Sequence, residues 1–268
     1  MKKAINITLV ILFNLCLIWI AIAQSALSLA SSKSFYQKEF KENGIYASYD
    51  SSGNETRKII YYVGGSDDTH ATLSDAQLNI IINHITDYLF ENKESFELTL
   101  NNVYILGEGY RNGVSVFGEA AISHMQDVRA LIKSVQISLT VTVILVVGIA
   151  VYFIFEKQSL KRRIFTYSRN FHFTLIALAL GFCIWSYLGS SDEIPFTLNL
   201  WKNLHFLIFP FQPEKISGSV LRDSLTVILT TELFISATVT VLSVLIFTVI
   251  TWLISAYFLE KRSLKLPK

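Results

Sequence analysis

The sequence predicts a mainly α-helical membrane protein. It should have four transmembrane helices, a small α+β extracytoplasmic cap and an interfacial or re-entrant segment before the last helix. Hydrophobic residues make up 51% of the 268 residues and charged residues only 16%, and the mean hydropathy is +0.43, which is too apolar for an ordinary soluble domain. Four apolar runs each have the roughly 20 residues needed to cross a bilayer. A polar stretch between the first two runs is long enough for a small folded layer.

The four transmembrane helices are predicted at 1–23, 134–155, 171–188 and 225–259. The last range is longer than a bilayer requires. If Lys261 and Arg262 fix its inner end, its outer boundary falls near Val239, and Glu232 lies outside the membrane or at its interface. The first run also fits a cleaved signal peptide, because Ala21-Ile22-Ala23 has the pattern of a small-residue cleavage site. The sequence leaves both alternatives open.

The positions of lysine and arginine predict the orientation. Basic residues gather at the N-terminus, in the loop 156–170 and in the tail 260–268, namely Lys2, Lys3, Lys157, Lys161, Arg162, Arg163, Arg169, Lys261, Arg262, Lys265 and Lys268. Because short cytoplasmic segments carry the excess of positive charge, both termini and this loop are predicted to be cytoplasmic. The segments 24–133 and 189–224 then face outward.

The cap at 24–133 is predicted to mix strands and one helix. Ser74 and Gln77 form a capping-box pattern ahead of apolar residues at helical spacing, and the helix should end near Phe90. Strand-like runs occur at 58–63, 103–106 and 114–117. The Asn112-Gly113 pair between the last two predicts that these strands form a hairpin.

The outer segment 189–224 contains an apolar and aromatic run at 198–211 that is too short to span a membrane. Its length suits an interfacial or re-entrant piece, which Pro210 would end. Trp201 fits the headgroup level of the membrane. His205 would therefore lie near the depth of the outer ends of the transmembrane helices.

His124 and Asp127 form the first candidate site. They are three residues apart, share one face of a helix that starts near Gly118 and Glu119, and precede the second apolar run. Asp127 could orient the imidazole while His124 accepts or donates a proton. Considered alone, an ordinary surface histidine explains His124 as well, and His205 could simply turn its polar edge to water. Their predicted meeting at one outer boundary favours a shared site.

The other histidines and the cysteines indicate structural roles. His84 is predicted to be a solvated residue of the cap helix, His70 lies in a polar turn, and His172 is on the cytoplasmic side. Cys16 and Cys183 lie in apolar runs and are predicted to be buried hydrophobic side chains. No metal-ligand spacing, nucleotide loop or nucleic-acid patch occurs, so no cofactor and no nucleic-acid partner are predicted.

Five segments resemble the bacterial lipoprotein intramolecular transacylase (Lit) family. The likeness covers most of the chain and is carried by Ser34–Phe40, Ile85–Leu89, Phe117–Glu119, His124–Val128 and Leu204–Phe209. Its sharpest part is His124-Met125-Gln126-Asp127-Val128, followed by His205 within the aromatic run. The chain departs from the family pattern at 211–213 and 230–232. Both histidines match the pattern, whereas Glu232 lies in a segment that departs from it.

The resemblance implies a membrane acyltransferase of the bacterial cytoplasmic membrane whose active site faces outward. Its substrate would be a diacylglyceryl-modified lipoprotein, and the sn-2 acyl chain would move to the α-amino group of the N-terminal cysteine, giving the lyso form. His124 and His205 would be catalytic, with support from Asp127, Glu232 and Trp201. The order of the two histidine roles, a covalent acyl-histidine and the oligomeric state stay open, and membrane lipids are the other expected partners.

Two other classes remain as alternatives. A sensor or accessory protein would use the cap as a binding module, but the cytoplasmic parts are too short for an output domain. A channel or transporter would need a polar pathway, and the four apolar runs have almost no ionisable residue in their middles.

Overall fold

The structure is a computed structural model that describes residues 2–46, 48–49, 55–56, 61–64, 70–90, 93–155, 163–191, 196, 199, 203, 225 and 228–264. The chain divides into two compact units. The membrane unit consists of Met1–Ala26, Val135–Ile208 and Thr238–Lys268, and the cap unit consists of Leu27–Ser134 and Phe209–Ala237.

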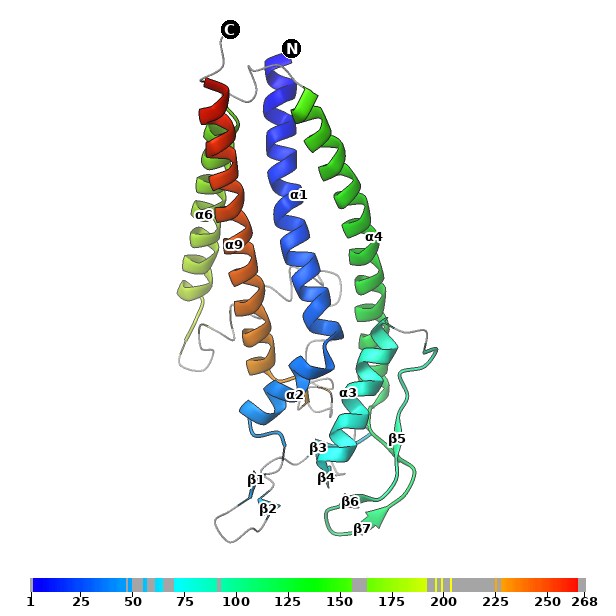
Figure 1. Cartoon of the computed structure of the whole chain (residues 1–268). Coiled ribbons are helices and arrows are strands. Elements are labelled where there is room, and N and C mark those ends of the chain that lie inside the picture. Colours follow the sequence, from blue (N-terminus) through cyan, green and yellow to red (C-terminus); the bar gives the residue numbers. More distant parts are fainter. Residues whose placement is uncertain are drawn as a thin grey trace. The chain divides into compact units, whose positions relative to one another are not determined.

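In the described part of the chain, four helices are long and apolar enough to cross a membrane: α1 (Lys2–Ser31), α4 (Glu119–Phe155), α6 (Ile164–Leu188) and α9 (Thr231–Leu264). The helices α1, α4 and α6 extend beyond the predicted transmembrane ranges, because a helix can continue into water on either side of the apolar run. As predicted, α4 begins at Glu119 and continues without a break into the second apolar run. Within the membrane unit, the start of α1, the end of α4, the start of α6 and the end of α9 lie at one end (Figure 1).

Two shorter helices of the cap unit lie in the described ranges 2–46 and 70–90. Helix α2 (Lys33–Glu42) starts at Ser32, whose hydroxyl accepts a hydrogen bond from the Phe35 N–H. Helix α3 (Asp75–Phe90) confirms the predicted capping box. The Gln77 N–H donates to the Ser74 hydroxyl at 3.2 Å, and the Ser74 N–H donates to the Gln77 side chain at 2.8 Å. Two N–H groups that helix geometry leaves unpaired are thereby satisfied, which is worth about 1 kcal/mol per cap.

The strands of the cap are short and pair antiparallel. A four-stranded sheet has the order β3 (Tyr61–Tyr62), β4 (His70–Thr72), β6 (Val103–Ile105) and β7 (Gly109–Arg111). Two further pairs are β1 (Ser48–Tyr49) with β2 (Glu55–Thr56), and β5 (Thr99–Leu100) with β8 (Val114–Ser115). His70 therefore lies in a strand rather than in the predicted turn. The predicted strand 58–63 contains β3, and its residues 58–60 are outside the described part.

The predicted hairpin between 103–106 and 114–117 is wrong. β6 pairs with β7 through a turn at Gly107, where φ is +82°, and β8 pairs with β5. Asn112 and Gly113 connect the two sheets instead. Asn112 accepts a hydrogen bond from the Asn102 N–H at 2.8 Å, and the Gly113 N–H donates to the side chain of Asn101 at 3.0 Å. An Asn-Gly pair therefore does not by itself determine which strands pair across the sheet.

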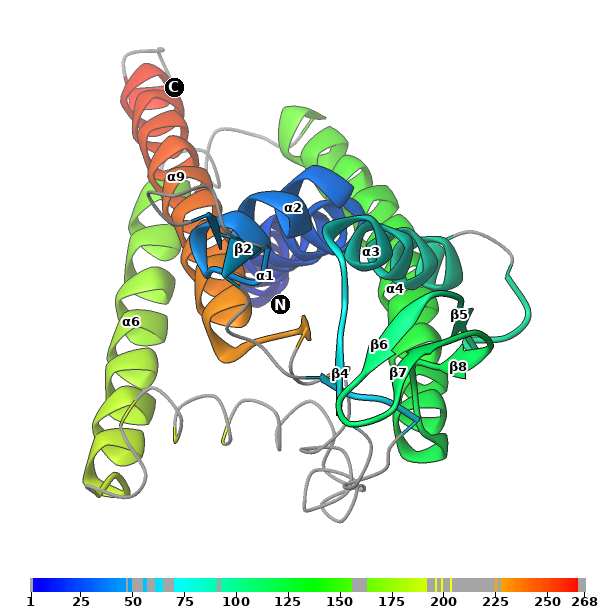
Figure 2. The same cartoon turned by 90° about the horizontal axis from the view of Figure 1, so that it is seen from below.

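The core of the cap unit joins α2, α3, the sheets and the first part of α4. Phe96 stacks on Phe117 with ring centroids 4.5 Å apart and contacts Tyr88 at 5.0 Å. Three core residues come from a distant part of the chain, Leu225, Ile228 and Leu233. The cap is therefore built from two stretches, although the sequence predicted it from 24–133 alone. Figure 2 shows α2, α3 and the β6–β7 hairpin of this unit from below.

The membrane unit has a smaller core. Phe13 of α1 contacts Phe153 of α4 at 5.4 Å and Trp252 of α9 at 4.8 Å between ring centroids. Many outward side chains are large and apolar, such as Phe155 and Phe247, as expected for helices that face lipid. Cys16 is buried as predicted, whereas Cys183 is exposed on α6.

Candidate functional site

His124 and Asp127 lie in the cap part of α4, and both side chains are half-buried. Met125, between them, is 2% exposed and belongs to the cap core. Because successive residues of an α-helix are about 100° apart, Met125 points into the core while His124 and Asp127 share a flank of the helix. The predicted common face of the two residues is confirmed by the continuous helix.

The other flank of α4 packs on α3. The Arg129 guanidinium lies 4.6 Å from the centre of the Tyr88 ring, and it donates to the Lys93 carbonyl at 2.6 Å. Arg129 is four residues after Met125, so its side chain lies about 40° around the helix from that of Met125. His124 lies on the other side of Met125. His124 thus lies on the flank of α4 that turns away from α3.

Two of the predicted site residues, His205 and Trp201, are outside the described residues. The meeting of His205 with His124 therefore stays a prediction. Glu232 lies in the first turn of α9 and is exposed, at the N-terminal end where a negative charge is favourable.

The structure identifies a buried carboxyl that the sequence analysis did not single out. Glu39 of α2 is 3% exposed. The Ser236 hydroxyl of α9 donates to its Oε1 at 2.7 Å, and the Asn43 side chain donates to its Oε2 at 3.4 Å. The sequence contained a signal, because Glu39 stands three residues after Tyr36 and next to Phe40, on the apolar side of α2.

His84 is buried, so the prediction of a solvated residue is wrong. Its Nε2 lies 3.0 Å from the Phe96 carbonyl, and the Lys93 ammonium lies 3.4 Å from its Nδ1. Burial lowers the pKa of His84 and outweighs the hydrogen bond to Phe96, which acts in the opposite direction. These contacts give His84 a structural role in the loop that follows α3.

The membrane unit contains a buried polar cluster around Asn14, which the sequence analysis also missed. The Asn14 Oδ1 accepts hydrogen bonds from Trp252 Nε1 at 2.8 Å and from His172 Nε2 at 2.9 Å, and its Nδ2 donates to the Ser168 hydroxyl at 3.1 Å. Indole N–H can only donate, so the atom it contacts must be the amide oxygen, and His172 Nε2 must carry a hydrogen. Asn14 therefore links α1, α6 and α9.

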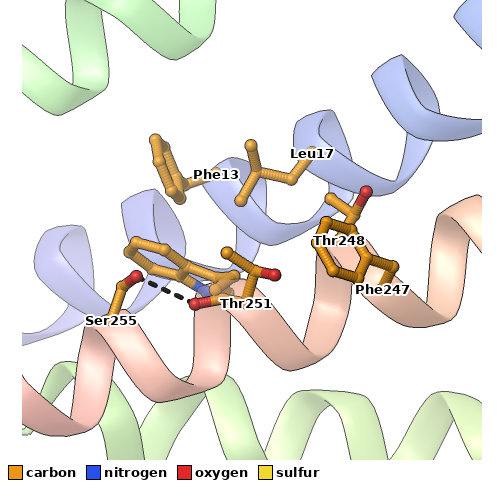
Figure 3. A pocket seen from close by; sticks show the side chains of 7 residues that line it. Phe13, Leu17, Phe247, Thr248, Thr251 and Ser255 are labelled. Atoms are coloured by element: carbon orange, nitrogen blue, oxygen red, sulfur yellow. Dashed lines mark hydrogen bonds between the residues drawn. The ribbon is translucent and has the colours of Figure 1, made fainter.

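A groove of about 310 Å³ lies between α1 and α9 of the membrane unit (Figure 3). It is lined by Phe13, Leu17, Phe247, Thr248, Thr251, Trp252 and Ser255. The hydroxyls of Thr248 and Ser255 donate to carbonyls of their own helix, each at 2.8 Å. None of the lining side chains is an acid or a base at neutral pH, so the groove suits an apolar chain rather than proton transfer.

Among the described residues, no group of three or more histidine, cysteine, aspartate or glutamate side chains gathers closely enough to hold a metal ion. His124 is partly exposed, directly precedes Met125 of the cap core and stands three residues before Asp127 on the same helix. That arrangement is suited to general acid or base catalysis.

Comparison with known proteins relates this fold to one family. The family model described as lipoprotein intramolecular transacylase Lit matches residues 10–190. This match includes His124 and Asp127, whereas Trp201, His205 and Glu232 lie beyond it. No curated protein sequence matches the chain.

Two solved structures of the membrane integral lipoprotein intramolecular transacylase Lit from Bacillus cereus share the fold. One aligns with a TM-score of 0.59 at 13% identity, covering 98% of this chain and 97% of that chain. The other, a variant with one histidine replaced by alanine, aligns with a TM-score of 0.58 at 14% identity, covering 98% and 96%.

Proposed function

The chain belongs to the lipoprotein intramolecular transacylase (Lit) family, and we propose that it moves the sn-2 acyl chain of a diacylglyceryl-modified lipoprotein to the α-amino group of that lipoprotein's N-terminal cysteine. The observation that carries the proposal is the family match over residues 10–190. The product is the lyso form. The family does not favour the alternative of a sensor or accessory protein.

The reaction exchanges an ester for an amide within one molecule. The amine nitrogen attacks the carbonyl carbon of the sn-2 ester, so a nitrogen–carbon bond forms and the carbon–oxygen bond to glycerol breaks. One proton leaves the amine and one reaches the departing alkoxide, so the step is balanced without water. Because both reacting groups belong to the substrate, holding them within attack distance supplies much of the rate enhancement.

His124 is assigned the role of general base, with Asp127 orienting its imidazole. His205 is assigned to stabilise the tetrahedral oxyanion or to protonate the leaving alkoxide. Support for the first assignment comes from the half-buried position of His124 beside the cap core. Asp127, Glu232 and Trp201 are supporting residues rather than proton-transfer groups.

Both termini are proposed to be cytoplasmic, with the active site facing outward. The helix ends that adjoin the basic N-terminus, the basic loop 156–170 and the basic tail lie together at one end of the membrane unit (Figure 1), which agrees with the bias of positive charge toward the cytoplasm. Because the substrate's two acyl chains are apolar, they lie among the membrane lipids during the reaction.

Separate His124→Ala and His205→Ala variants test the assignment. Each should lower conversion of a diacyl lipoprotein to the lyso form by about 10²- to 10⁴-fold, which is the usual contribution of a general acid or base. Mass spectrometry of the lipoprotein N-terminus measures the conversion. Asp127→Asn should cause a smaller loss, because it leaves the imidazole in place.

His70→Ala is the matched control, since it removes a cap histidine that lies in a sheet strand. It should keep the activity of the unmodified chain. Full conversion by either catalytic variant, with normal expression and membrane insertion, would show that the histidine concerned does not have the assigned role.

A further inference from the structure

Ser186, in the last turn of α6, is buried although both of its neighbours are exposed. Its exposed fraction is 0%, whereas Trp185 is 59% and Tyr187 is 65% exposed. A residue between two exposed neighbours can be buried only where another part of the chain covers that face of the helix. The end of α6 therefore has a docking point on one side.

Two asparagines from the segment after α6 contact Ser186. The Asn199 Nδ2 donates to the Ser186 carbonyl at 2.7 Å, and the Asn203 Nδ2 donates to the Ser186 hydroxyl at 3.2 Å. Both asparagines are helical, and residues four positions apart share one face of a helix. Phe196, three positions earlier, contacts the Tyr187 ring at 6.1 Å between centroids. These residues dock on α6 through one helical face.

The contact made by Asn199 stabilises the end of α6. The last four carbonyls of an α-helix lack an N–H partner within the helix, and the Ser186 carbonyl is one of them. Gly189, the residue after the helix, leaves room for the bond. A Cβ at Gly189 would lie 3.0 Å from the Asn199 Nδ2, closer than the roughly 3.5–4.0 Å of an ordinary non-bonded contact.

This docking point restrains the chain close to the second predicted catalytic histidine. His205 is two residues after Asn203, and Trp201 stands between the two asparagines in the sequence. Two residues span at most about 7 Å, so anchoring Asn203 limits the region that His205 can reach. The last turn of α6 lies at the end of the membrane unit away from both termini (Figure 1), which is the end proposed to face outward.

We propose that Asn203 is a positioning residue of the acyl-transfer site, which holds His205 in place by docking on Ser186, with Asn199 as the second anchor. The proposal rests on the proposed function, in which His205 acts on the oxyanion or on the leaving alkoxide. Such a group works only when it is held near its reacting atom, and a displacement of about 1 Å can cost about 10²-fold in rate. Two anchors one helical turn apart restrict both sliding and rotation of the segment on α6.

Steady-state kinetics of the purified full chain on a synthetic diacylglyceryl lipopeptide test the proposal, with mass spectrometry of the product. Asn203→Ala should lower kcat by roughly 10- to 100-fold and leave KM within about twofold, because it displaces a catalytic side chain without touching the substrate. Ser186→Ala should cause a similar loss, since it removes the other half of the same hydrogen bond. The two changes together should be no worse than the slower single variant.

A His205→Ala background separates positioning from a purely structural role. If Asn203 acts through His205, adding Asn203→Ala to His205→Ala should not change the residual rate, which longer incubations measure. A structural role would instead lower the rate by the same factor in both backgrounds.

Ser190→Ala is the matched control, because it removes a hydroxyl from the same helix end. The Ser190 hydroxyl donates to the Tyr187 carbonyl at 2.6 Å and not to the docked asparagines. Its replacement should keep kcat within about twofold, as for an ordinary surface substitution.

Two results would overturn the proposal while leaving the proposed function intact. One is an unchanged kcat in Asn203→Ala when His205→Ala is slow. The other is an equal fold-loss from Asn203→Ala with and without His205. Full activity of His205→Ala would contradict the role of His205 in the proposed function, and the positioning role of Asn203 would fall with it.

Discussion

Two glutamates of the cap unit differ in their role because one is buried and the other is exposed. Glu39 is 3% exposed, with hydrogen bonds from Ser236 and Asn43, whereas Glu232 is exposed on the first turn of α9. A polar group taken out of water is costly unless hydrogen bonds compensate it. The Glu39–Ser236 contact therefore stabilises the joint between α2 and the start of α9.

Replacing Glu39 tests this joint. Glu39→Ala should lower the free energy of unfolding by roughly 2 kcal/mol, because it removes both hydrogen bonds and leaves a small cavity. Glu39→Gln should lose less, because its amide oxygen can still accept from Ser236. Thermal unfolding in detergent measures the change.

Glu42→Ala is the control for Glu39→Ala. Glu42 is on the same helix, is exposed and forms an ion pair with Lys38 at 3.7 Å. Such surface pairs are worth at most about 1 kcal/mol. A loss in Glu42→Ala equal to that in Glu39→Ala would contradict a special role for the buried carboxyl.

Burial of His84 is expected to make the cap sensitive to acid. Burial lowers the pKa of His84 below its ordinary value of 6.5, so the unfolded chain binds a proton more readily than the folded chain. Stability is then unaffected well above pH 6.5 and decreases as the pH falls below that value, until the lowered folded-state pKa is passed. His84→Gln, which can still donate to the Phe96 carbonyl, should show a flatter decrease.

Melting temperatures at about pH 7.5 and about pH 5.5 check this dependence. The unmodified chain should lose more on acidification than His84→Gln, and His70→Gln should behave like the unmodified chain. An identical decrease in the unmodified chain and in His84→Gln would assign the acid sensitivity to other groups.

Helices and strands differ in how far the sequence predicts them. Helix α3 was predicted within a residue or two, because Ser74, Gln77 and the apolar spacing are local signals. The partners of β6 (Val103–Ile105) were not predicted. β6 pairs with β7, which follows it directly, and also with β4, which comes much earlier in the chain, so local signals cannot identify both partners. Similarly, Asn14 could be seen in the first apolar run, but its partners on α6 and α9 are more than 150 residues away.

The link between helices around Asn14 yields a stability prediction. Asn14→Leu removes hydrogen bonds to Ser168, His172 and Trp252, and such bonds in membrane proteins average about 0.6 kcal/mol each. The expected loss is roughly 2 kcal/mol. Asn6→Leu is the control, because Asn6 is also buried on α1 but accepts one hydrogen bond, from Tyr152 at 3.0 Å.

Unfolding of the membrane unit in increasing denaturing detergent measures both variants. Asn14→Leu should unfold at clearly lower detergent fractions than Asn6→Leu. Equal midpoints would show that the cluster does not hold α1, α6 and α9 together.

For the whole molecule, the sequence predicted the class and the four membrane helices. It also placed His124 and Asp127 on one face of a single helix from their spacing, and their catalytic role stays a prediction. The burial of Glu39 depends on contacts with a helix that begins at Thr231, so no local pattern could establish it. The predicted meeting of His124 with His205 depends on residues outside the described part of the chain.

The proposed orientation predicts the side of the membrane on which each end lies. A reporter enzyme that works only in the cytoplasm should be active when joined after Lys268, and inactive when joined within the cap at the exposed turn around Gly107. The reason is the cytoplasmic bias of basic segments. Activity of the reporter in the cap and inactivity at the C-terminus would reverse the assigned orientation.

The two-part core of the cap also determines when the cap can be completed during biosynthesis. The ribosome delivers residues 27–134 first, and Leu225, Ile228 and Leu233 only after two membrane helices have been made. Until then the growing cap has unfilled apolar sites and is exposed to proteases and chaperones. A nonsense mutation before codon 225 would thus leave an unfinished cap, which quality control can recognise.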